Sequence, residues 1–195
     1  MRVLVLDNGD ASTPVLVKAL EGLDAVCEIR DPGDLDIPGV LALKPRRILI
    51  TPGPIEPEQT GVCRRVVQDL AGQIPVLGLG LGMQVIAAVA GARLLPAKSR
   101  PEEGAVSSVR HDGRGIFEAL PSPVPLGRYG SSFVVEGGQE PPFVEFSAWS
   151  EEDGSLLGLR LSGLGVEGLQ VAPESFLTPA GNDMLFNFLY RSQTW

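Results

Sequence analysis

The sequence contains little cysteine and almost no histidine. Two cysteines, Cys27 and Cys63, are too few for a disulfide framework in a chain of 195 residues, which is typical of a protein in a reducing cytoplasm. The single histidine, His111, has no cluster of Cys or His residues around it. We therefore expect neither a metal site nor a bound cofactor, and a cytoplasmic location.

Basic residues and long apolar runs are also scarce. Sixteen Lys and Arg against 24 Asp and Glu give a net charge of −8, which argues against nucleic acid or an anionic membrane surface as a partner. No apolar run has the length of a membrane span. The apolar N-terminus meets Asp7 after a few residues, so it indicates a buried first strand rather than a signal peptide.

Strands and helices are predicted to alternate over the first ninety residues. Short apolar runs bounded by turn residues predict strands at 2–7, 25–30, 47–51 and 74–79. Helices are expected after Ser12, where Pro14 can occupy the first turn and Gly22 can end the helix, and at 40–44 and 58–71. This alternation is typical of a parallel sheet covered on both faces.

The remainder of the chain has a different pattern. From Arg93 onwards short strand-like segments are separated by Gly, Pro and Asp, and the Asp-Gly pair at 153–154 predicts a hairpin. Apolar residues at helical spacing in 180–192 predict a final helix. We expect one domain spanning 1–195, of the α/β class, with an open, mostly parallel central sheet and a C-terminal antiparallel portion.

A glycine-rich segment, "PVLGLGLGMQ", joins the fourth predicted strand to a helix, with glycines at 78, 80 and 82. A dinucleotide-binding loop would need the spacing G-x-G-x-x-G and an acidic residue about twenty positions later, and neither is present. The alternative is a nucleophile elbow, a sharp strand-turn-helix that exposes one side chain at its apex. The apex would be Gly80, which has no side chain.

Two further segments give this elbow a context. The segments "ILITPGPIEPEQTG" (48–61) and "GLQVAPESFLTPAG" (168–181), together with the elbow, resemble the three signature blocks of class I glutamine amidotransferases. "LDNGDAST", "SSVRHDG" and "RYGSS" add to a resemblance that is closest to the glutaminase subunits of anthranilate and para-aminobenzoate synthases. It covers nearly the whole chain in the same order, and implies the fold of that family.

In that family a cysteine attacks the amide of glutamine, and a histidine oriented by a glutamate transfers the proton. The resemblance places the nucleophile at Gly80, the histidine at Ala172 and the glutamate at Glu174, so only the glutamate is present. Without a thiol at 80 no glutamyl thioester can form, and the resemblance therefore predicts a chain without glutaminase activity.

The resemblance also implies positions that would bind glutamine or stabilise the oxyanion. They lie in the Pro-Gly-Pro loop, the elbow and the "RYGSS" segment: Gly53, Pro54, Ile55, Leu81, Gln84, Ser131 and Ser132. The family usually has glycine at the position of Ile55, and histidine at those of Met83 and Gly130, so these three positions depart from the pattern.

Other groups are poor substitutes for the missing pair. Packing roles are expected for Cys63, in a helix, and Cys27, in a strand, and a turn position for His111. Glu174 is expected to be a partly exposed carboxylate hydrogen-bonded near the "SFLTP" segment.

Three functions remain open at this stage. The first is a structural or regulatory partner of a chorismate-using synthase subunit. The others are a glutamine-binding sensor and an amidotransferase that uses non-standard catalytic groups.

Overall fold

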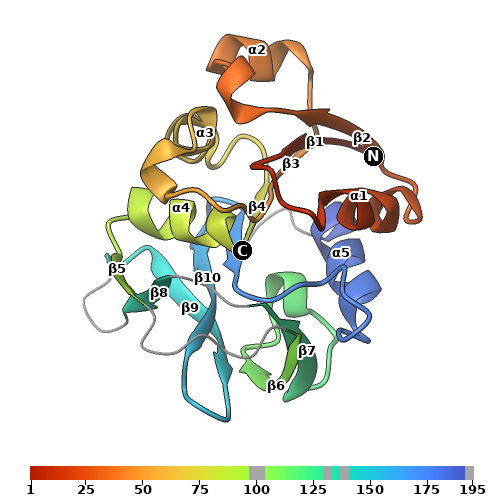
Figure 1. Ribbon diagram of the computed structural model, residues 1–195, viewed down its shortest axis with the longest axis vertical. Helices are drawn as coiled ribbons and strands as arrows, with labels where there is room; N and C mark the ends of the chain where they lie inside the picture. Colours follow the sequence, from red (N-terminus) through yellow and green to blue (C-terminus); the bar gives the residue numbers. More distant parts are fainter. Residues whose placement is uncertain (97–103, 130–132, 137–140, 192–195) are drawn as a thin grey trace.

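The computed structural model describes residues 1–96, 104–129, 133–136 and 141–191, and Figure 1 shows their arrangement. Within these ranges the strands are β1 (Arg2–Leu6), β2 (Val26–Arg30), β3 (Arg47–Ile50), β4 (Val76–Leu79), β5 (Arg93–Pro96), β6 (Ala105–His111), β7 (Val124–Arg128), β8 (Phe133–Glu136), β9 (Val144–Ser150), β10 (Leu156–Leu161) and β11 (Val166–Leu169). The α-helices are α1 (Thr13–Glu21), α2 (Ile37–Ala42), α3 (Val62–Leu70), α4 (Leu81–Val89) and α5 (Gly181–Tyr190). Three 3₁₀ turns are η1 (Pro32–Asp34), η2 (Pro57–Gln59) and η3 (Gly115–Phe117).

The central sheet has two halves. Nine strands follow the order β2-β1-β3-β4-β11-β10-β9-β6-β7, and β5 pairs with β8 in a separate two-stranded sheet. The pairings from β2 to β11 are parallel, and those from β11 to β7 are antiparallel. The predicted α/β fold with an antiparallel portion is confirmed, but the central sheet is evenly mixed rather than mostly parallel, because the antiparallel strands β10, β9, β6 and β7 continue the same sheet beyond β11.

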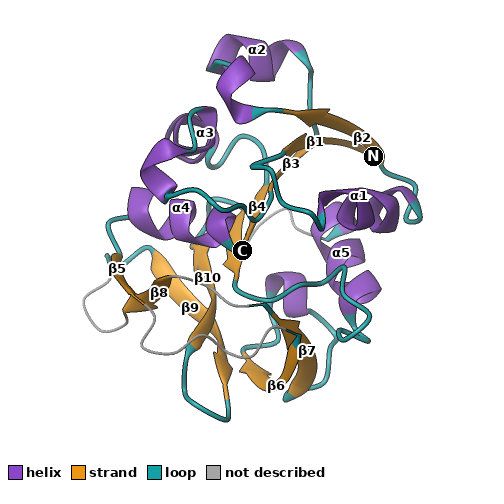
Figure 2. Cartoon of the chain, in the orientation of Figure 1, coloured by secondary structure: helices purple, strands orange, loops and turns teal. Residues whose placement is uncertain are grey.

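Helices cover both faces of the parallel half (Figure 2). Successive side chains of a strand point to opposite faces, so Leu4 packs in the cluster that contains α3 and α4, whereas Val3 packs in the cluster that contains α1 and α5. Both side chains are fully buried. Continuous apolar runs such as "VLVL" therefore follow from burial on both faces.

The connection that follows β1 and the connection that follows β3 run over opposite faces of the sheet. The chain runs from β1 through α1, on one face, to the edge strand β2, and returns through α2, on the other face, to β3. It continues through α3, on that second face, to β4. Adjacent strands whose connections diverge in this way define a topological switch point, which here lies between β1 and β3.

The predicted hairpin at the Asp-Gly pair is confirmed. Strands β9 and β10 pair in antiparallel fashion, and the amide of Ser150 donates to the carbonyl oxygen of Ser155 across the turn at 2.9 Å. Gly154 has φ +68°, the left-handed conformation that glycine adopts without steric cost.

Two predicted helices have different limits in the structure. The segment 58–71 is not one helix, because Gly61, at φ +54°, separates η2 from α3. The short helix predicted at 40–44 begins earlier, at Ile37, where the Asp36 carboxylate accepts a hydrogen bond from the Gly39 amide as N-cap. Within the described ranges no helix is both long and apolar enough to cross a membrane.

A buried charge network anchors the antiparallel half. Arg160, fully buried on β10, pairs with Glu167 on β11 and with Asp112 after β6. The Glu167 carboxylate also accepts a hydrogen bond from the Ile116 amide at 3.0 Å. Burial raises the pKa of Glu167 to about 7 in spite of the neighbouring guanidinium. This network lies at the opposite end of β11 from the elbow.

Candidate active site

The glycine-rich segment forms a sharp turn between β4 and α4. Gly80, at its apex, has φ +55° and ψ −109°, a conformation that costs a non-glycine residue about 1–3 kcal/mol. Its amide donates to the carbonyl oxygen of Leu169 at 2.8 Å, which ties the apex to the carboxyl end of β11. The backbone geometry is therefore that of a nucleophile elbow, as the sequence predicts.

The glycines on either side of the apex allow close packing of helix on sheet. A Cβ atom at Gly78 would lie 2.5 Å from the carbonyl carbon and oxygen of Gly82. A Cβ atom at Gly82 would lie 2.5 Å from the carbonyl oxygen of Ile50 on β3. Since the contacted atoms belong to the backbone, neither position has room for a side chain. Both glycines thus serve the close packing of α4, which a phosphate-binding role does not require.

The Pro-Gly-Pro loop after β3 lies directly against the elbow. A Cβ atom at Gly80 would lie 3.2 Å from Cβ of Pro52, and one at Gly53 would lie 3.1 Å from Cδ2 of Leu81. Gly53 also approaches Asn8 so closely that a Cβ atom would lie 2.6 Å from its Cβ. The structure thus brings together the predicted oxyanion loop and the first residue of α4.

The third signature block reaches the same place from β11. The side-chain amide of Gln170 donates to the carbonyl oxygen of Gly80 at 3.3 Å. Two residues further on, the amide of Ala172 donates to the carbonyl oxygen of Gly127 at 3.0 Å, and its carbonyl oxygen accepts from Oγ1 of Thr178 at 2.7 Å. Ala172 is therefore held firmly by its backbone, and its side chain is only a methyl group.

Glu174 is a carboxylate with an incomplete set of partners. Its Oε2 atom is buried and has no hydrogen-bond partner among the described residues, and burial raises the pKa of the side chain. A hydrogen bond with Ser12 opposes that shift, and the charge of Asp10 adds to it. The carboxylate also bonds to its own backbone amide, directly before the "SFLTP" segment as expected, and Ser12 is a further partner that comes from the loop after β1.

The other predicted binding residues fall into three groups. Leu81 and Gln84 are buried on α4, as is Met83. Pro54 and Ile55 are exposed on the loop after β3. Gly130, Ser131 and Ser132 lie outside the described residues.

Neither cysteine is placed to replace a nucleophile at the elbow. Cys63 is fully buried on α3, and burial raises the pKa of its thiol to about 12. Cys27 is half-buried on the edge strand β2, where burial raises the pKa of its thiol to about 11. Because the thiolate is the reactive form, burial disfavours both thiols as nucleophiles near neutral pH.

His111 has a structural environment. It is the last residue of β6, not a turn residue as predicted, and its ring stacks on Phe117 with 4.6 Å between ring centroids. One ring nitrogen lies 2.8 Å from the carbonyl oxygen of Pro121, and the other accepts from the Gly113 amide at 3.1 Å. Both nitrogens are engaged, so the imidazole is not available as a base.

Comparison with known proteins gives this arrangement a family. The family model of class-I glutamine amidotransferases matches residues 4–192. The chain belongs to the class-I glutamine amidotransferase family. It is 42% identical to anthranilate synthase component 2 of Thermus thermophilus, over 97% of this chain and 92% of that protein. It is 35% identical to aminodeoxychorismate synthase component 2 of Escherichia coli, over 97% of this chain and 100% of that protein.

A solved structure supports the fold independently. A glutamine amidotransferase of Thermotoga maritima superposes with a TM-score of 0.79 at 15% identity, over 98% of this chain and 97% of that chain. The amidotransferase fold is thus present with an elbow whose apex is glycine.

Two polar contacts of the family positions were not predicted from the sequence. Gln170 and Ser12 contact the apex and Glu174 respectively, across long sequence separations. The position of Gln170 was one usable signal in the sequence. It directly follows a strand, and polar residues at the carboxyl ends of parallel strands converge on one edge of the sheet.

Proposed function

We propose that this chain is a structural or regulatory subunit that docks on a chorismate-using synthase subunit and does not hydrolyse glutamine. The observation that carries the proposal is the elbow with glycine at its apex. With Gly80 in place of a thiol and Ala172 in place of an imidazole, these two positions supply neither an atom that can attack the amide carbon nor a base to move its proton. Glu174 alone can only accept a hydrogen bond or a proton.

The relatives support the partner class. Several are the second components of anthranilate or aminodeoxychorismate synthases, and a second component implies a first. The family resemblance seen in the sequence implies that this first component is a chorismate-using enzyme. Without ammonia from this chain, such a partner would use free ammonia.

An exposed aromatic pair beside the emptied site suits a docking surface. The Phe176 side chain is 88% exposed and that of Tyr129 is 46% exposed. The Tyr129 hydroxyl lies 3.0 Å from Oγ of Ser175, so the two rings belong to neighbouring segments just after Ala172 and β7. Aromatic side chains are enriched at interface centres, and such exposure is costly on a surface that stays in water.

Co-elution with candidate synthase subunits tests the proposal. We expect a complex with at least one such subunit, and a loss of affinity of tenfold or more in Phe176→Asp. Phe143→Asp is the matched control, because Phe143 is also exposed, at 44%, but precedes β9 at the opposite end of the sheet. Absence of a complex with every candidate, or equal weakening by the two variants, would contradict the proposal.

A further inference from the structure

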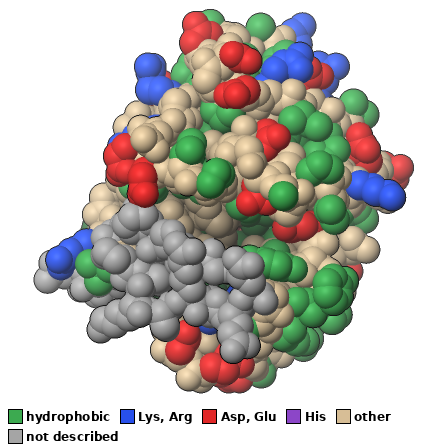
Figure 3. Space-filling model, in the orientation of Figure 1, with side chains coloured by type: hydrophobic (Ala, Val, Ile, Leu, Met, Phe, Trp, Pro, Cys, Tyr) green, Lys and Arg blue, Asp and Glu red, His purple; other side chains and the backbone are tan. Residues whose placement is uncertain are grey.

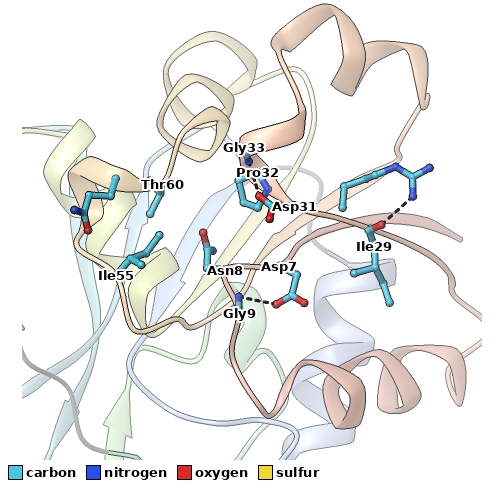
Figure 4. A pocket seen from close by; sticks show the side chains of 11 residues that line it. Asp7, Asn8, Gly9, Ile29, Asp31, Pro32, Gly33, Ile55 and Thr60 are labelled. Atoms are coloured by element: carbon cyan, nitrogen blue, oxygen red, sulfur yellow. Dashed lines mark hydrogen bonds between the residues drawn. The ribbon is translucent and has the colours of Figure 1, made fainter.

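A crevice of about 430 Å³ with a mixed polar and apolar lining opens at the carboxyl ends of β1, β2 and β3. The loop after β1 contributes Asp7, Asn8 and Gly9, and the segment at the end of β2 contributes Asp31 and Pro32. Ile55 and Thr60 close it from the loop after β3. In Figure 4, Ile55 and Asp31 lie on opposite sides of Asn8.

The position of the crevice is that of a ligand site in an open α/β sheet. It lies at the topological switch point between β1 and β3, where the connections leave on opposite faces and the loops separate. The elbow, by contrast, follows β4. The crevice therefore lies beside the elbow rather than at it, and the Pro-Gly-Pro loop, which packs on Asn8 and carries Ile55, borders both.

Both carboxylates of the crevice have one oxygen to spare. Oδ1 of Asp7 accepts from the Gly9 amide at 3.0 Å and from Oγ1 of Thr13 at 2.8 Å. Oδ1 of Asp31 accepts from the Gly33 amide at 2.7 Å. In the part of the chain that the structure describes, Oδ2 of either residue forms no hydrogen bond. These bonds fix the side chains and leave acceptor capacity for a ligand.

A third acceptor comes from a buried amide. The Asn8 side chain is only 8% exposed, and its Nδ2 donates to the carbonyl oxygen of Thr51 at 3.1 Å. Within the described residues, its Oδ1 accepts a hydrogen bond from the thiol of Cys63 alone, at 3.8 Å, and a thiol is a weak donor. A buried amide oxygen without a strong donor is costly, so this atom favours a donor-bearing ligand.

Among the described residues, the one cation that lines this crevice is already engaged by other groups. Arg30 is one of its lining residues, but its guanidinium pairs with Glu28 and donates to the carbonyl oxygen of Ile29 at 2.9 Å. On the face shown in Figure 3, acidic side chains are spread across the surface and basic ones lie mainly at its outline. With a net charge of −8, the protein attracts cations.

We propose that the switch-point crevice binds a small organic cation, a primary ammonium group on a short aliphatic body. The ammonium donates to Asp31, Asp7 and Asn8, and the aliphatic body packs on Ile55 and Pro32. Three acceptors match the three N–H donors of an ammonium group. The volume is within the range of small-molecule sites and exceeds what a single metal ion needs. The proposal does not depend on the proposed docking function.

Titration of the labelled full chain with n-butylammonium chloride, followed by amide NMR, tests the proposal. We expect saturable shifts centred on Gly9, Gly33 and Thr60. Sodium butyrate, butanol and sodium chloride at matched concentration should produce no saturable shift there. If butanol or sodium chloride shifts the same amides equally, or if no shift saturates, the proposal is wrong.

Asp31→Asn supplies the decisive variant, because asparagine keeps the N-cap acceptor for η1 while it removes the charge. We expect butylammonium to bind at least fivefold more weakly. Asp34→Asn is the control, since it removes one charge from the same 3₁₀ turn but does not line the crevice, and its affinity should be unchanged. Equal weakening in both variants would indicate general electrostatic attraction and overturn the site.

A lysine-containing tripeptide provides a further test. If the tripeptide binds and butylammonium does not, the proposal is wrong and the crevice is assigned to a partner's side chain instead.

Discussion

The elbow and the switch-point crevice lie on the same edge of the sheet, yet they are built in opposite ways. At the elbow the backbone is closely packed, and the apex residue, Gly80, has no side chain. At the crevice two carboxylates and a buried amide surround open space. The elbow therefore has the backbone geometry of a reactive site without a side chain at its apex, whereas the crevice has polar side chains without an assigned reaction.

The comparison of the two regions shows which contacts fix the backbone shape of the elbow. Gly78 and Gly82 are required by helix-sheet contacts that exist whether or not a thiol occupies the apex. The shape of the turn is thus set by packing, and it says nothing about activity. Activity has to be argued from the side chains at 80, 172 and 174.

Gly82→Ala gives the largest expected effect. Its Cβ would lie 2.5 Å from the carbonyl oxygen of Ile50, so we expect a loss of about 3 kcal/mol of unfolding free energy, measured by denaturant unfolding. Gly22→Ala is the control, because Gly22 has φ −62° and its Cβ would have contacts no closer than 3.4 Å. That variant should be neutral or stabilised by about 0.5 kcal/mol. Equal effects in the two variants would refute the packing role of the elbow glycines.

Gly80→Ala should cost less, about 2 kcal/mol. The cost combines the positive φ angle with a contact of 3.2 Å to Pro52. Gly154→Ala, at φ +68° with no atom within 4 Å of the new Cβ, isolates the backbone term and should cost about 1 kcal/mol. Thermal unfolding of both variants measures the difference. A fully tolerated Gly80→Ala would mean that the strained turn relaxes when the apex changes.

Glu174→Gln should produce a small, pH-dependent gain. Burial raises the pKa of Glu174 above its ordinary value of 4.5, so the folded state binds the proton more tightly than the unfolded chain. Its contribution to stability is therefore complete below pH 4.5 and is lost as pH rises through the raised pKa. The neutral variant should match the parent at pH 4 and exceed it by about 1 kcal/mol at pH 8. Destabilisation at pH 8 would show that the carboxylate is satisfied by partners.

The sequence allowed the elbow, the alternating parallel half and the Asp-Gly hairpin to be predicted, because each rests on residues close together in the chain. The break at Gly61 was missed, since Gly61 lies against Pro32 of a distant loop. The contact of Glu174 with Ser12 and the crevice were missed for the same reason. Asp7, Asp31 and Ile55 come together only once the order β2-β1-β3 is known.

The most direct test of the central claim is glutamine hydrolysis by the purified chain, with and without a synthase subunit that binds it. We predict no ammonia release above the uncatalysed rate in either case, and measurable release from the double variant Gly80→Cys, Ala172→His. Glutaminase activity in the unaltered chain would contradict the account, because it would require a nucleophile other than the residue at the apex of the elbow.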